Sequence, residues 1–289
     1  MRVLGVLVDR NITLFRSNKR NVLLSFASIL IVMGLYAIFL RNFILDSVAA
    51  NGLSGILAQE FTDRTMIGGF MIVLNTTTCF GIMQLCVEDA SSGIRKDFLV
   101  APVTEFKILI GYFISSILVS SFFTIVTVIS AECYFYIRYD NPMDIETLSH
   151  VVLQVIAISI INSQLLLCFM KLIKDTTTFS TFGNLYGMMS GFLAGTYLPY
   201  PMYPDTLKKV LLFYPPTHLA SMMRKIYLGD FSKRMEASPM KSLCNQLFDV
   251  FGVNIKWNNT DISGKVQVCI LLLYFCLFLI ILKLSYRKK

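Results

Sequence analysis

The chain has 289 residues, of which 55% are hydrophobic and 15% are charged, and its mean hydropathy is +0.64. This composition excludes an ordinary soluble globular protein and is typical of a chain that lives in a membrane. The formal net charge is +8. Most basic residues stand at the ends of apolar runs, so we interpret the charge as a topology signal and expect no nucleic-acid partner.

Residues 1–18 carry apolar side chains at helical spacing. Leu4, Leu7 and Val8 fall on one face and Asp9 and Arg10 on the other, which predicts an amphipathic helix. A basic helix of this kind before a membrane span is expected to lie along the inner membrane surface. The apolar run that follows is too long for the core of a signal peptide, so we expect it to be retained.

Six apolar runs are long enough, or nearly so, for the roughly 20 residues that cross a bilayer core as a helix. In hydrocarbon each segment must satisfy its own backbone hydrogen bonds, which favours helices. The fold class predicted is therefore an all-α membrane protein with six transmembrane helices in one domain, residues 1–289. The runs are Val22–Leu40, Met66–Val87, Ile108–Ile129, Val151–Met170, Thr178–Leu198 and Val266–Leu284.

The segment 88–107 between the second and third runs is charged at its start and then apolar. Glu88 and Asp89 open it, Phe98 and Leu99 follow, and Pro102 prevents a helix from continuing. A plain connector needs no such apolar residues between charges. The sequence predicts a short helix that presents Phe98 and Leu99 to a groove on another protein; a loop resting on lipid head groups is the alternative.

Glycine recurs at every fourth position of the fifth run, at Gly183, Gly187, Gly191 and Gly195. This spacing predicts a smooth ridge on which another helix can pack closely. The ridge fits two uses, tight packing inside one subunit or a sliding surface along a pathway.

Residues 199–265 follow the fifth run and begin with five prolines between residues 199 and 216. The prolines separate two short apolar segments, Asp205–Phe213 and Thr217–Leu228, each too short to cross a bilayer. Because irregular backbone at membrane depth must be covered by protein or water, we predict a re-entrant helical hairpin near the outer surface. Residues 231–265 are more polar and are expected to form an extracellular cap.

Basic residues set the expected orientation. The segments assigned to the cytoplasm contain Arg16, Lys19, Arg95, Lys96 and Lys174, among others, whereas the short outer loops are poor in lysine and arginine. The positive-inside rule places both termini in the cytoplasm. The expected location is the plasma membrane of a bacterial cell.

No catalytic signature is present in the sequence. It has no glycine-rich phosphate loop with its lysine, no paired histidines at metal-binding spacing and no nucleophile elbow. The seven cysteines are scattered and do not suggest a disulfide framework. We expect a chain that is not an enzyme and binds no cofactor of its own.

Three segments resemble the type-2 ATP-binding-cassette permease family. The first is the amphipathic N-terminal helix before a span. The second is the 88–107 segment, which is similar to a family motif at Glu88, Gly93, Leu99, Pro102 and Val103. The third, after the glycine-rich run, is similar to the family signature at Ser190, Gly191, Pro199, Pro204, Pro215 and Arg224.

The resemblance implies a transport assembly. This chain would pair with a second copy of itself or with a related permease, and two cytoplasmic ATPase subunits would bind ATP and magnesium. The 88–107 segment would couple the subunits, which gives Glu88, Asp89, Gly93, Phe98 and Leu99 as candidate coupling residues. The second and fifth spans usually face the pathway, which gives Asn75, Thr76, Thr78, Asn184 and Tyr186 as candidate lining residues.

The expected function is therefore export. Lining residues of low charge suit an amphiphilic cargo such as an antibiotic, a peptide toxin or a lipid-like metabolite. A permease for a cell-wall glycan or another polysaccharide remains an alternative, and so does a carrier driven by an ion gradient.

Overall fold

The computed structural model describes residues 2–100, 103–173, 175–236, 240–257 and 260–287. Nearly all of these residues are helical, and the strands among them form a small antiparallel hairpin of β1 (Lys256–Trp257) and β2 (Thr260–Asp261). The predicted all-α class is confirmed.

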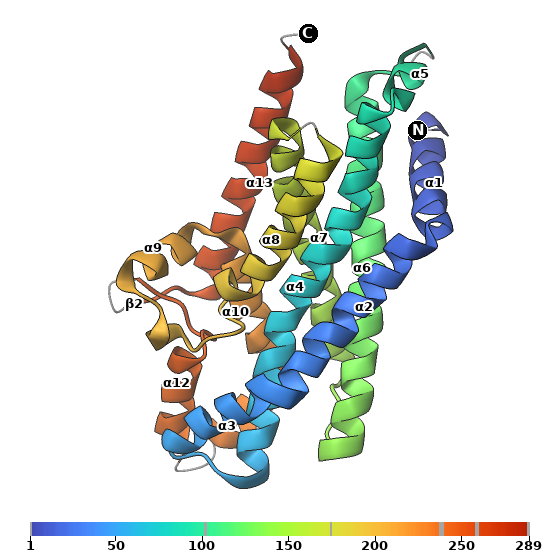
Figure 1. The fold of residues 1–289 in the computed structure, drawn as a ribbon. Coiled ribbons are helices and arrows are strands. Elements are labelled where there is room, and N and C mark those ends of the chain that lie inside the picture. The colour runs from blue at the N-terminus through green and yellow to red at the C-terminus, as the bar shows by residue number, and fades with distance from the viewer. Residues whose placement is uncertain (1, 101–102, 174, 237–239, 258–259, 288–289) are drawn as a thin grey trace.

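A bundle of long helices forms the body of the molecule (Figure 1). Its members are α4 (Gly55–Ser91), α6 (Glu105–Tyr139), α7 (Ile145–Leu172), α8 (Thr176–Leu193) and α13 (Gly264–Arg287). Helix α4 lies at the centre, in contact with α6, α7 and α8, and most of its residues are buried. At 1.5 Å per residue, α4 and α6 are each longer than 50 Å, roughly, so both extend well beyond a bilayer core of about 30 Å.

The N-terminal segment consists of α1 (Arg2–Ser17), α2 (Lys19–Leu35), a π-helical turn η1 (Tyr36–Leu40) and α3 (Arg41–Ala50). In α1, the residues Leu7, Asn11 and Phe15 are buried at every fourth position, so one side of the predicted helix faces inward. This face packs on protein, because Leu7 lies against Gly111 and Asn11 donates to Ser115 of α6. Helix α1 therefore runs alongside α6, which differs from a helix resting on lipid alone.

Five stretches among the described residues are long and apolar enough to cross a membrane. They are Met33–Ala50, Gly55–Ser91, Glu105–Tyr139, Ile145–Met170 and Gly264–Ile281. The first lies later in the chain than the predicted Val22–Leu40. Helix α8 is not among them, since threonines, Asn184 and glycines make it more polar than its neighbours. A sixth span stays a prediction.

The predicted fifth span was wrong at its C-terminal end. Helix α8 stops at Leu193, and Gly195 follows in the left-handed region with φ +64°. Glycine tolerates this conformation and is common just beyond a helix end. Gly195 is therefore a helix-terminating residue and does not extend the glycine ridge.

The other glycines of the ridge make close contacts. A Cβ on Gly183 would lie 1.9 Å from the Phe80 ring of α4, and one on Gly187 would lie 3.2 Å from Thr77 of the same helix. Gly191 meets the Tyr197 ring instead. The ridge thus packs inside the subunit at Gly183 and Gly187, as one of its two interpretations expected.

The proline-rich segment forms α9 (Asp205–Phe213) and α10 (Pro215–Tyr227), preceded by a 3₁₀ turn η2 (Tyr200–Met202). The two helices match the predicted segments within two residues at each boundary. Helix α10 is largely buried and packs on α4, α7 and α13. Whether the pair is re-entrant stays a prediction.

The expected polar cap contains two further helices, α11 (Gly229–Glu236) and α12 (Lys241–Val250). Their apolar faces join a core with α3 and the beginning of α4, in which Phe231, Leu247 and Phe251 surround Phe61 and Val48. The cap is thus packed onto one end of the bundle. The start of α1, the end of α13 and the short helix α5 (Ile94–Val100) lie at the other end (Figure 1).

Candidate functional site

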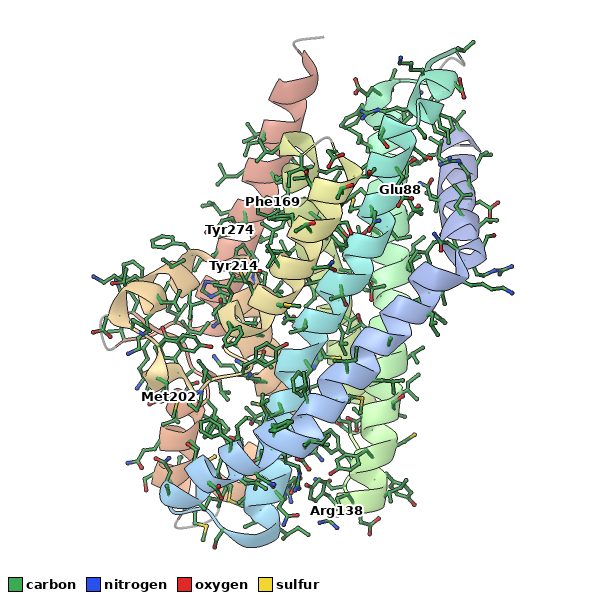
Figure 2. The ribbon with its side chains drawn as sticks, viewed as in Figure 1. Glu88, Arg138, Phe169, Met202, Tyr214 and Tyr274 are labelled. Atoms are coloured by element: carbon green, nitrogen blue, oxygen red, sulfur yellow. The ribbon has the colours of Figure 1, made fainter. Side chains whose placement is uncertain are left out.

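The predicted coupling residues lie where α4 ends, α5 begins and α1 crosses close to both. Figure 2 shows Glu88 at this end of the bundle and Arg138 at the opposite end. We refer to the first region as the α5 end. A short helix is present in the 88–107 segment, as predicted, and α6 begins directly after it at Glu105.

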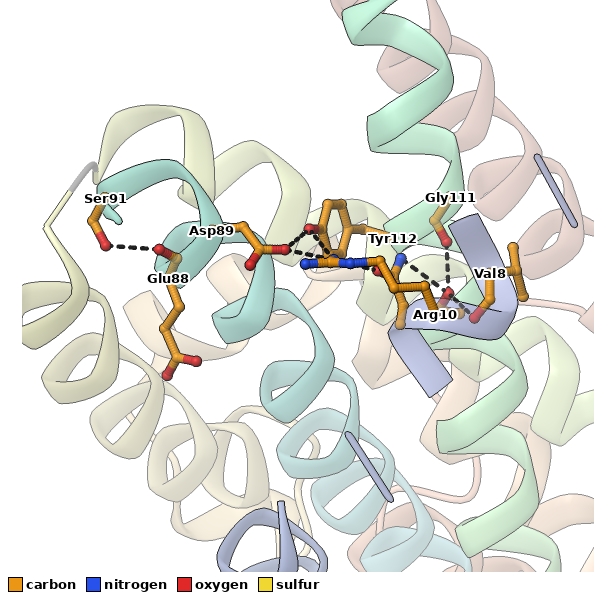
Figure 3. Close-up of polar contacts among 9 residues, drawn as sticks. Val8, Arg10, Glu88, Asp89, Ser91, Gly111 and Tyr112 are labelled. Atoms are coloured by element: carbon orange, nitrogen blue, oxygen red, sulfur yellow. Dashed lines mark hydrogen bonds and ion pairs between the residues drawn. The ribbon is translucent and has the colours of Figure 1, made fainter. Parts of the chain in front are cut away.

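Asp89 is the centre of a buried polar triad at the α5 end (Figure 3). Its Oδ2 accepts a hydrogen bond from Arg10 Nη1 of α1 at 2.6 Å and another from the Tyr112 hydroxyl of α6. Arg10 also donates to the Tyr112 oxygen at 3.2 Å. The triad joins α1, α4 and α6, so Asp89 is committed to contacts within the chain.

The electrostatics of Arg10 follow from this geometry. Burial lowers the pKa of Arg10, but the hydrogen bond and the charge of Asp89, together with Tyr112, raise it by more, so the net direction is upward. Arg10 therefore stays protonated, and a charge-assisted pair of this kind is stronger than a neutral hydrogen bond.

Glu88 has a different environment from its neighbour Asp89. Its side chain is half-buried and accepts from Gln84 Nε2 at 3.0 Å, and its backbone oxygen accepts from the Ser91 hydroxyl (Figure 3). No ion pair of Glu88 occurs among the described residues. Of the two acidic residues, Glu88 is the one left available to another protein.

Gly93 makes the turn from α4 into α5. Its φ is +86°, in the left-handed region, and no atom lies near the position that a Cβ would take. The turn therefore requires glycine for its backbone conformation and not for space.

Phe98 does not point away from the chain as the sequence suggested. Its ring is half-buried, packs against the core that contains Phe15 and lies under the Arg10 guanidinium, 4.8 Å from ring centroid to Cζ. The side chain of Leu99 lies outside the described residues. Val100, at the end of α5, is 89% exposed and Ile94, at its start, is 39% exposed. Among the described side chains of this helix, Val100 is the apolar one most open to a partner.

Asn75 is the centre of a hydrogen-bond network among α4, α6 and α7. It donates to Thr124 at 3.1 Å and to Ser159 at 2.7 Å, and it accepts from Asn162 at 3.1 Å. Each of these side chains is almost completely buried. The network holds three membrane helices together through polar side chains, an arrangement that stabilises helix association in lipid.

The other predicted lining residues have varied surroundings. The hydroxyls of Thr76 and Thr78 are buried and donate to carbonyls of their own helix. Asn184 is exposed on α8, and the Tyr186 hydroxyl lies 2.8 Å from that of Tyr214. All five stay predicted lining residues, and Asn184 differs from the others in facing outward from the single chain.

Sequence reasoning missed a second buried cluster, at the end opposite α5. Asp63 of α4 is 1% exposed and pairs with Arg41 of α3, with 2.9 Å between Nε and Oδ1. Its carboxylate also accepts from the hydroxyls of Tyr36, Tyr134 and Tyr139. One turn earlier, Glu60 pairs with Arg64 and Arg234. The predicted span begins only at Met66, so these charges fall outside it, whereas the helix begins at Gly55.

Arg224 of α10 was also missed as a buried residue. It is 1% exposed and donates to the carbonyl oxygens of Ala194, Gly195 and Gly252. A cation at the carbonyl end of a helix is favourable, so Arg224 caps α8. A Cβ on Gly69 of α4 would lie 2.7 Å from Arg224 Nη2, so this glycine makes room for the arginine.

Within the described ranges no three His, Cys, Asp or Glu side chains lie close enough together to hold a metal ion. The two clusters of charge are instead internal ion pairs that fasten helices to one another. These ion pairs position the helices relative to one another, and the described residues form no catalytic constellation.

Comparison with protein families gives a match over residues 9–284 to the model described as "ABC-2 family transporter protein". A comparison with curated proteins gave no match. The matched range covers nearly the whole chain, including the N-terminal segment, the central helices and the last helix. An ABC-2 permease is a membrane-embedded transport subunit whose ATPase resides in a partner. The chain belongs to the ABC-2 transporter family.

Proposed function

We propose that this chain is the membrane-spanning subunit of an exporter that uses ATP hydrolysed by two separate cytoplasmic ATPase subunits. The observation that carries the proposal is the α5 end. There a short helix is held between the protruding ends of α4 and α6 and carries a nearly fully exposed valine. Such a helix can insert an apolar side chain into a groove of another protein.

The triad of Arg10, Asp89 and Tyr112 supports a coupling role for this region. Movement of α5 driven by a bound ATPase reaches α4 directly through the Gly93 turn. It reaches α1 through the contact between Phe98 and Arg10, and α6 through the ion pair between Arg95 and Glu105. Glu88 remains available for a polar contact with the ATPase. The proposed coupling set is thus Glu88, Gly93, Phe98 and Val100, with Asp89 acting inside the permease.

The proposed topology places the α5 end in the cytoplasm. The start of α1 and the end of α13 lie at the same end (Figure 1), which agrees with the placement of both termini by the positive-inside rule. The cap of α11 and α12 is then extracellular, and the membrane is the plasma membrane of a bacterial cell.

The proposed cargo is amphiphilic: an antibiotic, a peptide toxin or a lipid-like metabolite. Helix α8 presents Asn184 together with Leu185, Met188 and Phe192 on its exposed face. A pathway shared with a second permease subunit, identical or related, would therefore have a mixed apolar and amide surface on this side. That surface suits a molecule with both characters better than a highly hydroxylated glycan.

Purification of the chain from its native membrane tests the proposal. We expect an ATPase subunit of roughly 25–35 kDa, the size of one to two domains, to co-purify and to hydrolyse ATP. A chain that purifies alone, without hydrolysis, and whose transport collapses when an ionophore removes ion gradients would instead show a gradient-driven carrier.

A substitution pair tests the coupling surface. Val100→Asp places a charge at the exposed tip of α5 and is expected to remove the ATPase while leaving the permease folded, because this side chain makes few contacts within the chain. Ile145→Asp is the matched control, since Ile145 is 86% exposed and stands after the outer end of α6. Equal ATPase retention by the two variants would remove α5 from the coupling surface.

A further inference from the structure

Two arginines from different helices converge on one side-chain oxygen at the end of the bundle opposite α5. Arg138 Nη2, in the last turn of α6, donates to Gln59 Oε1 at 3.0 Å, and Arg41 Nη2, at the start of α3, lies 3.5 Å from the same oxygen. Gln59 is neutral. It accepts a hydrogen bond from both guanidinium groups but compensates the charge of neither.

The nearby carboxylates do not supply the missing charge. Asp63 neutralises Arg41, and its oxygens already accept from Arg41 and three tyrosine hydroxyls. A carboxylate offers about four lone-pair positions, so Asp63 has none left for Arg138. Glu60 already pairs with two arginines, Arg64 and Arg234, and its Oε1 also accepts from Asn141. Arg138 forms no ion pair with any residue in the described part of the chain.

Two guanidinium groups and one carboxylate leave a single positive charge beside Arg41 and Arg138. One phosphodiester, with its single negative charge, would neutralise it. Guanidinium groups bind phosphate oxygens in a fork geometry that a lysine cannot reproduce. Arg138 is exposed, so a phosphate can reach it from outside the bundle.

The surroundings of the arginine pair favour a lipid as the source of that phosphate. Next to Arg138, Tyr136 is 59% exposed and Ile137 is 83% exposed, and on the N-terminal segment Phe39 and Phe43 are exposed as well. Exposed tyrosines and arginines beside apolar side chains are typical of the interface between hydrocarbon and head groups. Figure 2 shows Arg138 at the extreme end of α6, the depth at which head groups lie if the bundle crosses the membrane.

We propose that Arg41 and Arg138 bind the phosphate of an anionic phospholipid, whose acyl chains lie against the exposed apolar side chains of η1 and α6. The bound lipid would join the N-terminal segment to α6 beside the Asp63 cluster and would hold the two together. The inference rests on the proposed function only for the side of the membrane, since the proposed topology places Arg138 at the outer surface and the lipid in the outer leaflet.

The experiment measures lipid-dependent thermal stability of the full chain in a nonionic detergent. Phosphatidylglycerol, phosphatidylcholine and inorganic phosphate are each titrated, and the melting temperature is followed. We expect phosphatidylglycerol to raise the melting temperature saturably and more than phosphatidylcholine, whose choline cation cancels the phosphate charge. Inorganic phosphate is expected to have no such effect, because it brings no acyl chains.

Arg138→Gln is expected to bind phosphatidylglycerol about tenfold more weakly, which is the loss of one charge-assisted contact. Lys233→Gln is the matched control. It removes a positive charge at the same end of the molecule, from a side chain that is 78% exposed, and should bind as the unmodified chain does. Unchanged affinity in Arg138→Gln, or an equal loss in Lys233→Gln, would overturn the site. An equal rise in melting temperature with inorganic phosphate would show that the site binds free phosphate and is not specific for a lipid. None of these readouts requires an ATPase, so they remain informative if the proposed function fails.

Discussion

Asp63 and Asp89 occupy opposite ends of α4, and each accepts hydrogen bonds from an arginine of the N-terminal segment and from tyrosine of α6. Asp89 accepts from Arg10 and Tyr112, and Asp63 accepts from Arg41, Tyr134 and Tyr139. The two carboxylates are about 39 Å apart along the helix at 1.5 Å per residue, slightly more than the hydrocarbon thickness of a bilayer.

Between these two fastenings, α2 runs in contact with α4 and also carries exposed apolar side chains. Leu23, Leu30 and Ile31 of α2 are each more than 60% exposed. The segment is thus held by polar contacts at its ends together with buried apolar residues such as Phe15 and Val48, and the exposed side chains of α2 can meet lipid or another subunit.

The Asp89 triad is expected to contribute measurably to stability and coupling. Asp89→Asn keeps the shape of the side chain but removes the charge that pairs with Arg10. The two side chains are 10% and 26% exposed, so we expect a loss of about 1–2 kcal/mol, below the value for a fully buried pair. The measurement is thermal unfolding in detergent, together with the rate of transport per ATP hydrolysed.

A double-mutant cycle separates the pair from its surroundings. Asp89→Asn and Arg10→Gln should each destabilise the chain, and the double variant should lose much less than the sum. Glu88→Gln is the control and should change stability little, because Glu88 pairs with no cation among the described residues. Additive losses in the cycle would show that Arg10 and Asp89 do not act as a pair.

The glycines of the α8 ridge are expected to differ in how well they tolerate replacement by alanine. Gly183→Ala would place a Cβ 1.9 Å from a Phe80 ring carbon, and the Phe80 ring is stacked on Phe179 with 4.7 Å between centroids. Phe80 must leave this stack, so we expect a cost of about 1–3 kcal/mol. Gly187→Ala meets only a methyl group at 3.2 Å and should cost far less.

Gly5→Ala provides the baseline for this comparison, because no atom lies within 4 Å of the new Cβ. The gain in helix propensity from glycine to alanine is up to about 1 kcal/mol and is common to all three variants. Melting temperatures in the order Gly5→Ala, Gly187→Ala, Gly183→Ala, from highest to lowest, are expected. If Gly183→Ala proves as stable as Gly187→Ala, the helices are not packed as closely there as the structure shows.

The sequence was sufficient for the elements that depend on local pattern. Proline positions and apolar spacing gave α9 and α10 within two residues at each boundary, and the 3.6-residue repeat gave α1. The ends of the long helices were harder to predict from the sequence. Glu60, Asp63 and Arg64 continue α4 beyond the apolar run. Asp63 pairs with Arg41 of α3 and accepts from tyrosines of α6, and Glu60 pairs with Arg64 and with Arg234 of α11; most of these partners are distant in sequence.

The same reason separates the local features of the α5 end that the sequence predicts from those it misses. Gly93 and the short helix after it were identified because a turn and an apolar cluster are local signals. The sequence could not show that Asp89 is bound inside the chain while Glu88 stays available. That difference depends on Arg10, some 80 residues away from Asp89 in the chain. Phe98 was predicted to face a partner, but the fold places Arg10 over its ring. A long-range contact therefore covers Phe98, whereas Val100 stays exposed.

His218 of α10 is expected to make stability depend on pH. Burial lowers the pKa of His218 from the ordinary value of 6.5, and its hydrogen bond with the Leu212 carbonyl offsets this only in part. The neutral ring donates from Nε2 to that carbonyl, and buried Nδ1 has no partner among the described residues, so a second proton would find no acceptor.

The unfolded chain takes up that proton as the pH falls below about 6.5, whereas the folded chain resists it, so stability is complete above this pH and is lost on acidification. Melting temperatures measured at pH 7.5, 6.5 and 5.5 should therefore decrease, and His218→Gln should flatten the decrease. The chain contains two histidines, and the second, His150, is exposed, so His150→Gln is the matched control and should retain the full dependence. A profile that His218→Gln leaves unchanged would mean that other groups cause the acid sensitivity and that the folded protein accommodates a charged imidazole at this position.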